Sequence, residues 1–122
     1  MAEKYSDVTA FAQPSSDQSS SHDSLNEYPR TVAVVVTYNR EDLLPKTLAG
    51  IASGERVPAA VVIVDNASTD GTAEYLRTLD YELPVECIRL ESNMGGAGGF
   101  AVGIDRALER HNPDSVSYTH LR

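Results

Sequence analysis

Val61-Val-Ile-Val-Asp-Asn-Ala-Ser-Thr-Asp-Gly71 is the stretch that decides the fold of this chain. Its apolar run ends at the carboxylate of Asp65, and residues typical of turns and helix caps follow at once. This order is typical of a buried parallel strand that brings one acidic side chain to the open edge of an α/β sheet. Ligands bind at such edges, beyond the carboxyl ends of the strands.

Strands and helices are expected to alternate on both sides of this stretch. Residues 31–37 form a continuous apolar run, which predicts a strand covered on both faces, as in parallel sheets. Further strands are expected over 59–64 and 85–90, and helices over 41–52, 73–79 and 100–110. We expect Asn39 to cap the first helix, Asp70 and Thr72 to cap the second, and residues 93–99 to form a glycine loop. This order predicts half of a doubly wound parallel sheet.

The two ends of the chain depart from this pattern. Residues 1–29 are rich in Ser, Asp and Gln and poor in apolar groups, so we expect a disordered acidic tail before a domain at 30–115. Residues 116–122 read Val-Ser-Tyr-Thr-His-Leu-Arg. They match, residue for residue, one translated frame of a transposase adapter used to prepare DNA sequencing libraries. We therefore predict that they are non-native and leave them out of the fold and the site.

The composition bounds the function classes. The chain has 122 residues, enough for one small domain at most. Its net charge of -8 argues against a nucleic-acid-binding surface. The single cysteine, Cys87, excludes an internal disulfide and a multi-cysteine metal site, and its apolar surroundings predict a buried side chain. No segment resembles a signal peptide or approaches the roughly 18 apolar residues of a membrane span, so we expect a cytoplasmic chain.

Three motifs carry chemistry suited to the predicted sheet edge. Tyr38 offers a flat face for stacking on a base or ribose, or it packs on the next helix. Asp65, with Asn66 beside it, can accept a hydrogen bond from a uracil or thymine imide or from ribose hydroxyls, or it caps the following turn. The glycines of residues 93–100 let the backbone approach a phosphate at a helix N-terminus, or let that helix pack closely. Residues 96–101 also fit the dinucleotide pattern G-x-G-x-x-A, but after the third strand rather than the first.

Together these motifs resemble glycosyltransferase family 2, the inverting nucleotide-sugar transferases with a GT-A fold. The matching stretches are residues 32–40, 61–72 and 93–100, and the last is most similar to the actinobacterial branch that adds rhamnose or galactofuranose to lipid-linked cell-wall glycans. The resemblance implies an α/β fold, the N-terminal half of a Rossmann-like, doubly wound GT-A domain. It implies a nucleotide site formed by Thr37, Tyr38, Asn39, Arg40, Asp65 and Asn66. It also implies a donor loop formed by Asn93, Gly95, Gly96, Gly98 and Gly99.

The resemblance also implies partners. They are a UDP- or dTDP-linked sugar donor, a glycan or lipid-linked acceptor, and peripheral association with the inner face of the plasma membrane. Family enzymes hold a divalent metal (Mg or Mn) on an Asp-x-Asp after a further apolar strand, and use a later carboxylate as base. We find neither in these residues, so we assign no catalytic residue and expect no transferase activity from the chain as given. The alternatives are a non-catalytic, Rossmann-like nucleotide-binding module and an inactive fragment.

Overall fold

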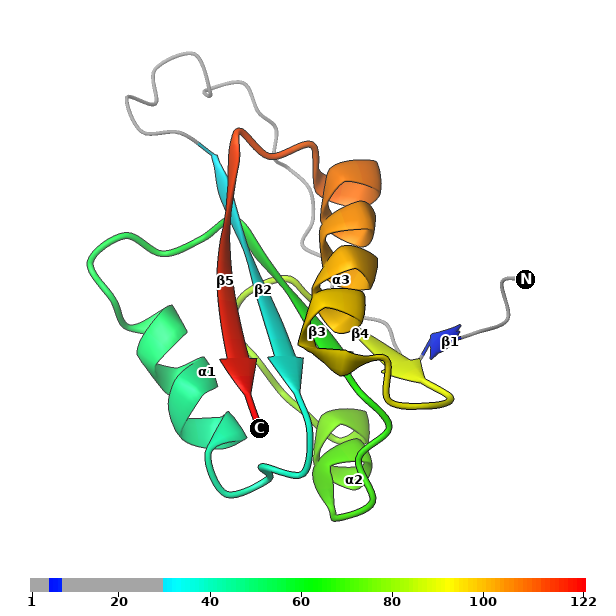
Figure 1. Ribbon diagram of the computed structural model, residues 1–122. Coiled ribbons are helices and arrows are strands. Elements are labelled where there is room, and N and C mark those ends of the chain that lie inside the picture. The colour runs from blue at the N-terminus through cyan, green and yellow to red at the C-terminus, as the bar shows by residue number, and fades with distance from the viewer. Residues whose placement is uncertain (1–4, 8–29) are drawn as a thin grey trace.

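A computed structural model describes residues 5–7 and 30–122 of the chain (Figure 1). Its elements, in chain order, are β1 Tyr5–Asp7, β2 Thr31–Thr37, α1 Leu44–Ala52, β3 Ala60–Asp65, α2 Thr72–Arg77, β4 Val85–Leu90, α3 Gly95–His111 and β5 Ser115–Leu121. The predicted α/β class is confirmed. Two expected strands, 31–37 and 85–90, have the predicted bounds, and the expected strand at 59–64 begins and ends one residue later.

In the described part of the chain, five strands form one sheet in the order β1-β4-β3-β2-β5. Neighbours among β4, β3, β2 and β5 are parallel, and β1 lies antiparallel to β4. The strand order reverses at β2, because α3 carries the chain from β4 back across the sheet to β5 (Figure 1). Open α/β sheets bind ligands at such a switch point, outside the carboxyl ends of the strands. Here that point lies between β2 and β5.

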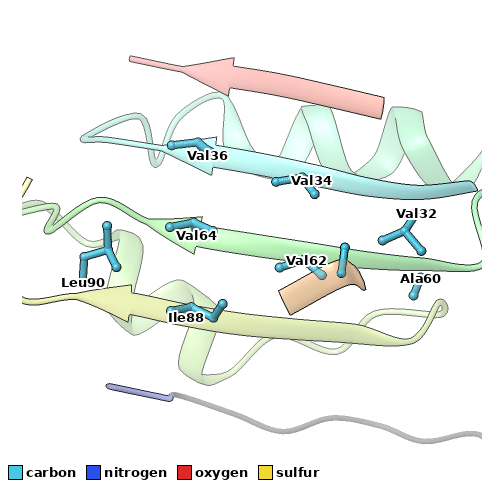
Figure 2. Packing of buried hydrophobic residues seen from close by; sticks show 9 residues of the cluster. Val32, Val34, Val36, Ala60, Val62, Val64, Ile88 and Leu90 are labelled. Atoms are coloured by element: carbon cyan, nitrogen blue, oxygen red, sulfur yellow. The ribbon is translucent and has the colours of Figure 1, made fainter. Parts of the chain in front are cut away.

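Two apolar clusters, one on each face of the sheet, make up the core. Alternate side chains of β2, β3 and β4 pack under α3, among them Val34 and Val64 (Figure 2). The intervening side chains, such as Val35 and Ile63, pack against α1 and α2. Because both faces are covered, β2 and β3 read as unbroken apolar runs rather than alternating ones. Cys87 is buried in the second cluster, as the sequence predicts.

Helix α3 begins at Gly95, so the expected glycine loop at 93–99 is wrong for most of its length. The reason is packing, which outweighs the low helix propensity of glycine. Gly99, Gly103 and Ala107 recur every fourth residue and form the buried stripe of α3. A Cβ at Gly103 would lie 2.5 Å from Val34 Cγ1. The small stripe therefore lets the helix backbone lie close to the sheet.

The start of α1 also differs from the prediction. The helix begins at Leu44 rather than at residue 41, and its N-cap position, Leu43, makes no side-chain capping hydrogen bond. Pro45 occupies the first turn, where an N–H would have no helical partner, so proline fits there. Asn39 lies too early to cap this helix, and it is used instead to join two loops, as described below.

An ionic cluster holds the last turns of α3 against β4. The side chain of Glu86 is 7% exposed and accepts a hydrogen bond from Arg106. Arg110 Nη1 lies 3.5 Å and His111 Nε2 lies 3.7 Å from its carboxylate oxygens. Burial raises the pKa of Glu86, but the contacts with His111 and Arg106 outweigh burial and leave that pKa below its ordinary value.

The two ends of the chain bear on the predicted domain limits. Tyr5–Asp7, within the segment expected to be a disordered tail, form β1 along β4. The rest of that prediction, residues 1–4 and 8–29, lies outside the described residues. Residues 116–121, which we left out of the predicted fold, belong to β5 and pair with β2. Unlike β2, β5 has no fully buried side chain. The non-native origin of residues 116–122 stays a prediction.

Candidate functional site

Three loops meet at the carboxyl edge of the sheet: residues 38–43 after β2, 66–71 after β3, and 91–94 after β4 (Figure 1). Side chains at or one residue before the ends of these strands also form a row across the sheet. Thr37 stands opposite Asp65, and Asp65 stands opposite Arg89. Most of the predicted site residues therefore gather at one edge, although they lie far apart in the sequence.

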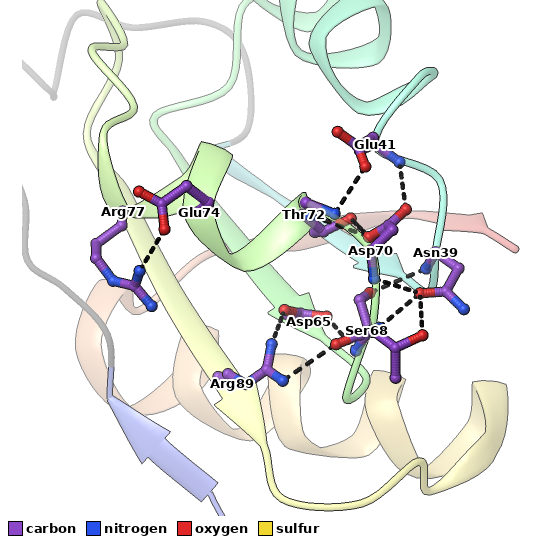
Figure 3. A network of polar contacts seen from close by, with 11 residues as sticks. Asn39, Glu41, Asp65, Ser68, Asp70, Thr72, Glu74, Arg77 and Arg89 are labelled. Atoms are coloured by element: carbon purple, nitrogen blue, oxygen red, sulfur yellow. Dashed lines mark hydrogen bonds and ion pairs between the residues drawn. The ribbon is translucent and has the colours of Figure 1, made fainter.

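Asp65 is buried and fully engaged by the protein. Its side chain is 1% exposed. Oδ1 accepts a hydrogen bond of 3.0 Å from the Ser68 amide, and Oδ2 lies 2.7 Å from Arg89 Nη1 (Figure 3). The turn-capping contact that the sequence left open is thus present. A role for Asp65 toward a nucleoside stays a prediction.

Arg89 is the residue at this edge that the sequence analysis missed. Besides the ion pair with Asp65, its Nη2 donates a hydrogen bond of 3.1 Å to the Ser68 carbonyl. Its side chain is 35% exposed, so the guanidinium reaches the surface while the carboxylate below it does not. A signal for it existed. Arg89 is a charged residue one position from the end of an apolar strand, which is where a partner for Asp65 would stand.

Asn39 joins the loop after β2 to the loop after β3. Its Oδ1 accepts hydrogen bonds from the amides of Thr69 at 2.7 Å and Asp70 at 3.2 Å. Its own amide donates to Ser68 Oγ at 2.9 Å (Figure 3). Asn39 has a left-handed backbone, with φ of 51°, a conformation that asparagine tolerates better than most residues. It acts as a latch between loops, and the predicted capping role is wrong.

A second pair of contacts extends the same latch. The amide of Glu41 donates to Asp70 Oδ2 at 3.2 Å, and the amide of Gly71 donates to Glu41 Oε1 at 2.7 Å. Asp70 Oδ1 accepts bonds from the amide and hydroxyl of Thr72, the first residue of α2, from the position before the N-cap residue Gly71. Asp70 thus bonds a free amide at the helix start, whereas the expected capping role of Thr72 is wrong, because Thr72 lies inside the helix. Burial raises the pKa of Asp70, but the bonds from Thr72 outweigh burial and leave that pKa lowered.

The remaining predicted residues on the β2 side differ in their surroundings. Thr37 is fully buried, and its Oγ1 has no hydrogen-bond partner among the described residues. Tyr38 is half-buried, and its amide donates to the Leu121 carbonyl at 2.9 Å. Arg40 forms two hydrogen bonds with Asp42, at 3.1 and 3.0 Å, and these bonds lower the pKa of Asp42. Tyr38, Asn39 and Arg40 are thus half-buried, whereas Thr37 is fully buried.

Asn66 and Asn93 hold the start of α3. Asn66 is buried. Its Oδ1 accepts from the Met94 amide at 2.8 Å and its Nδ2 donates to the Gly95 carbonyl at 3.0 Å. Asn93 is exposed, and its Oδ1 accepts from the Gly95 amide at 2.7 Å. Gly95 needs its glycine identity, because its φ is 77°. These contacts bring the N-terminus of α3 to the carboxyl edge.

The other glycines of the predicted donor loop are helical. Gly96, Gly98 and Gly99 follow within the first turns of α3, and Gly99 is buried against Val36. Close helix packing, the alternative that the sequence left open, is thus the observed use of Gly99. The dinucleotide pattern at residues 96–101 lies wholly inside the helix, whereas that fingerprint requires its first glycine in a tight turn before the helix. The structure does not support it.

The structure has a large hollow, but it lies away from this edge. A hollow of about 790 Å³ opens at the opposite, amino ends of the strands, lined by residues such as Arg30, Ile51 and Thr119, and by none of the predicted site residues. Within residues 5–7 and 30–122, no group of three or more His, Cys, Asp or Glu side chains is placed to hold a metal ion. The helices of the described ranges also lack the length and apolar character that crossing a membrane requires.

Comparison with known proteins identifies the family. The sequence model described as Glycosyl transferase family 2 matches residues 32–110. That range holds β3, β4, most of β2 and nearly all of α3, and with them every predicted site residue. The chain belongs to glycosyl transferase family 2. The resemblance noted from the motifs is therefore confirmed, and the α/β sheet is that of this family's N-terminal half.

Curated relatives of this family 2 chain include sugar transferases of known name. Galactofuranosyltransferase GlfT1 of Mycolicibacterium smegmatis is 37% identical over 76 residues, which are 62% of this chain and 24% of that protein. GlfT1 of Mycobacterium tuberculosis strain H37Rv is 42% identical over 79 residues, 62% of this chain and 25% of the relative. Undecaprenyl-phosphate mannosyltransferase of Micrococcus luteus is 34% identical over 83 residues, 66% of this chain and 33% of that protein.

These matches cover only part of each relative. The chain spans between 24% and 33% of the length of these curated relatives. No solved structure matches it at a significant level.

Proposed function

We propose that this chain binds the nucleotide of a sugar donor at the carboxyl edge of its sheet, as the N-terminal part of a glycosyltransferase. One observation carries the proposal. The ends of β2 and β3 and the N-terminus of α3 bring Tyr38, Asp65 and the first turn of α3 to the carboxyl edge of the sheet, within the range that the family model matches. These groups supply, in order, a stacking face, a hydrogen-bond acceptor and helix amides suited to phosphate.

The geometry sets a condition on how Asp65 takes part. Each carboxylate oxygen has two acceptor sites, and Ser68 and Arg89 take one site on each oxygen. The remaining sites are covered, since the side chain is 1% exposed. The proposal therefore requires the cover over this carboxylate to open when a nucleoside binds, with the Ser68 and Arg89 contacts kept. Tyr38 is only half-buried, so it depends less on such a movement.

The wider reaction is proposed from the family and from its relatives. The donor is a UDP- or dTDP-sugar, the acceptor is a glycan or lipid-linked glycan of the cell wall, and transfer inverts the anomeric centre in one displacement at the cytoplasmic face of the membrane. The names of the relatives, a galactofuranosyltransferase and an undecaprenyl-phosphate mannosyltransferase, support this acceptor class. The described residues do not fit a divalent metal, because Asp65 is paired with Arg89 and no metal-holding group is present among them. We derive no step through a metal and expect no sugar transfer by these 122 residues alone.

Ligand-observed NMR on the purified chain tests the binding. We expect UDP or dTDP to bind with a Kd on the order of 1 mM, about −4 kcal/mol, and NAD not to bind. Tyr38→Leu should weaken binding about fivefold or more, since base–aromatic stacking contributes about 1–3 kcal/mol. Tyr38→Phe is the matched control, because it keeps the ring. Binding of NAD without UDP or dTDP would favour the dinucleotide alternative, and binding of none of the three would leave an inactive fragment.

A further inference from the structure

We infer that Arg89 is a positioning residue of the nucleotide site, which holds Asp65 and the loop after β3 in the geometry that a pyrimidine nucleoside requires. The inference rests on the proposed function. Arg89 is absent from the residues that the family resemblance supplies. It is assigned here from its contacts alone.

Arg89 bridges strand β4 and the end of strand β3 with its following loop. It stands on β4 directly opposite Asp65 on β3. One guanidinium nitrogen lies 2.7 Å from Asp65 Oδ2, and the other donates to the Ser68 carbonyl at 3.1 Å. A guanidinium is a rigid, planar fork, so these two contacts fix the carboxylate and the following turn relative to each other. A lysine ammonium carries the same charge but lacks this fork.

The burial of Asp65 makes its carboxylate depend on Arg89. The carboxylate is 1% exposed, whereas the arginine side chain is 35% exposed. A buried carboxylate stays ionised only when it is paired and hydrogen-bonded. In the described part of the chain, Arg89 is the cation that forms an ion pair with it. Without Arg89, Asp65 would lose the partner that offsets the cost of its burial, and we expect its carboxylate to leave the position that a ligand would meet.

Arg89 is also linked, through Ser68, to the loop that carries Tyr38. Ser68 accepts the Arg89 hydrogen bond through its carbonyl, and its Oγ accepts one from the Asn39 amide at 2.9 Å (Figure 3). Asn39 directly follows Tyr38. Arg89 therefore anchors, through Ser68, the two loops that carry the proposed nucleoside contacts. Its effect on binding acts through these residues.

The test compares binding of the full chain to a nucleotide and to its nucleoside, either UDP and uridine or dTDP and thymidine, by NMR titration. Arg89→Ala and Arg89→Lys should weaken binding of both ligands about tenfold, the lower end of what losing an outer-shell partner costs at metal and catalytic sites. Arg77→Ala is the matched control, because Arg77 forms an exposed ion pair with Glu74 on α2 (Figure 3). It should change neither affinity more than about twofold.

A double-mutant cycle with Asp65→Asn separates positioning from direct contact. Because Arg89 contacts both Asp65 and Ser68, Arg89→Ala should cause a smaller loss in the Asp65→Asn background than in the unmodified chain. Should Arg89→Ala fail to fold, judged by circular dichroism, Arg89→Lys carries the same comparison.

Three results would overturn the inference. The first is equal affinity in the Arg89 and Arg77 variants. The second is a loss confined to the nucleotide, which would mean that Arg89 contacts phosphate. The third is additive loss with Asp65→Asn. If the unmodified chain binds neither nucleotide, the proposed function itself fails and this inference fails with it.

Discussion

The packing of α3 on the sheet makes Gly103→Ala the sharpest stability test of this fold. A Cβ at residue 103 would lie 2.5 Å from Val34 Cγ1 and 3.1 Å from Val64 Cγ2. Ordinary carbon contacts lie at about 3.5–4.0 Å, so the helix and the strands would have to separate by about 1–1.5 Å. Val34 is fully buried and β-branched, and such side chains have little rotamer freedom to give way.

The expected magnitude follows from two opposing terms. Replacing glycine by alanine inside a helix gains about 1 kcal/mol. Overpacking a filled core costs about 1–3 kcal/mol, and the 2.5 Å contact places Gly103→Ala in the upper half of that range. We therefore expect a net loss of about 1–2 kcal/mol in the free energy of unfolding.

Gly50→Ala in α1 is the matched control. A Cβ at residue 50 would meet no heavy atom within 4 Å, so the helix-propensity gain stands alone. We expect a stabilisation of about 1 kcal/mol. At about 4–8 °C per kcal/mol for a domain of this size, the two variants should differ in Tm by roughly 10–20 °C in thermal melts followed by circular dichroism. A Gly103→Ala variant as stable as Gly50→Ala would refute the close approach of α3 to Val34.

Three further predictions concern the Asn39 latch, the buried carboxylate of Glu86 and residues 116–122. Asn39→Ala should destabilise the chain about 1 kcal/mol more than Asn39→Gly in urea titrations, because both lose the latch but only alanine is strained at a φ of 51°. Glu86→Gln should destabilise the chain at pH 7. The folded pKa of Glu86 is lowered from 4.5, so its stabilisation is present above pH 4.5 and lost below it, and the deficit of the variant should shrink in acid melts. Long-read sequencing of the source gene should read, after the codon for Asp114, an apolar strand in place of residues 116–122. An identical reading through Arg122 would contradict the proposed non-native origin.

The strands could be predicted closely because strands buried on both faces consist almost entirely of apolar residues. Residues 31–37 and 60–65 are almost entirely apolar, and a run covered on both faces needs no partner to be recognised. The start of α3 could not be predicted in the same way. Residues 95–99 contain four glycines, which by local propensity oppose a helix. The helix exists because Gly99 and Gly103 face Val36 and Val34, and that contact spans more than sixty residues of sequence.

For the site, too, the positions of some residues could be predicted from the sequence but their contacts could not. Asp65 and Asn66 could be placed at the sheet edge because they end an apolar run, but their partners could not. Asn66 holds the start of α3, and Asp65 pairs with a residue on the neighbouring strand. Arg89 was missed because an arginine in a strand reads, from sequence alone, as a solvated side chain. Its place one residue from the end of an apolar strand was a signal, but only the register shows that it stands opposite Asp65.

These contacts determine which substitutions can report on binding. Asn39, Asp65 and Asn66 each fasten one loop to another element, so replacing any of them would loosen the edge and weaken binding together. Tyr38 makes no side-chain contact of this kind among the interactions found in the described residues, and the residue is half-buried. A fall in nucleotide affinity at unchanged stability is therefore expected for Tyr38→Leu, whereas Asn39→Ala should lower stability and affinity together. The ratio of these two effects distinguishes a ligand contact from a latch at this edge.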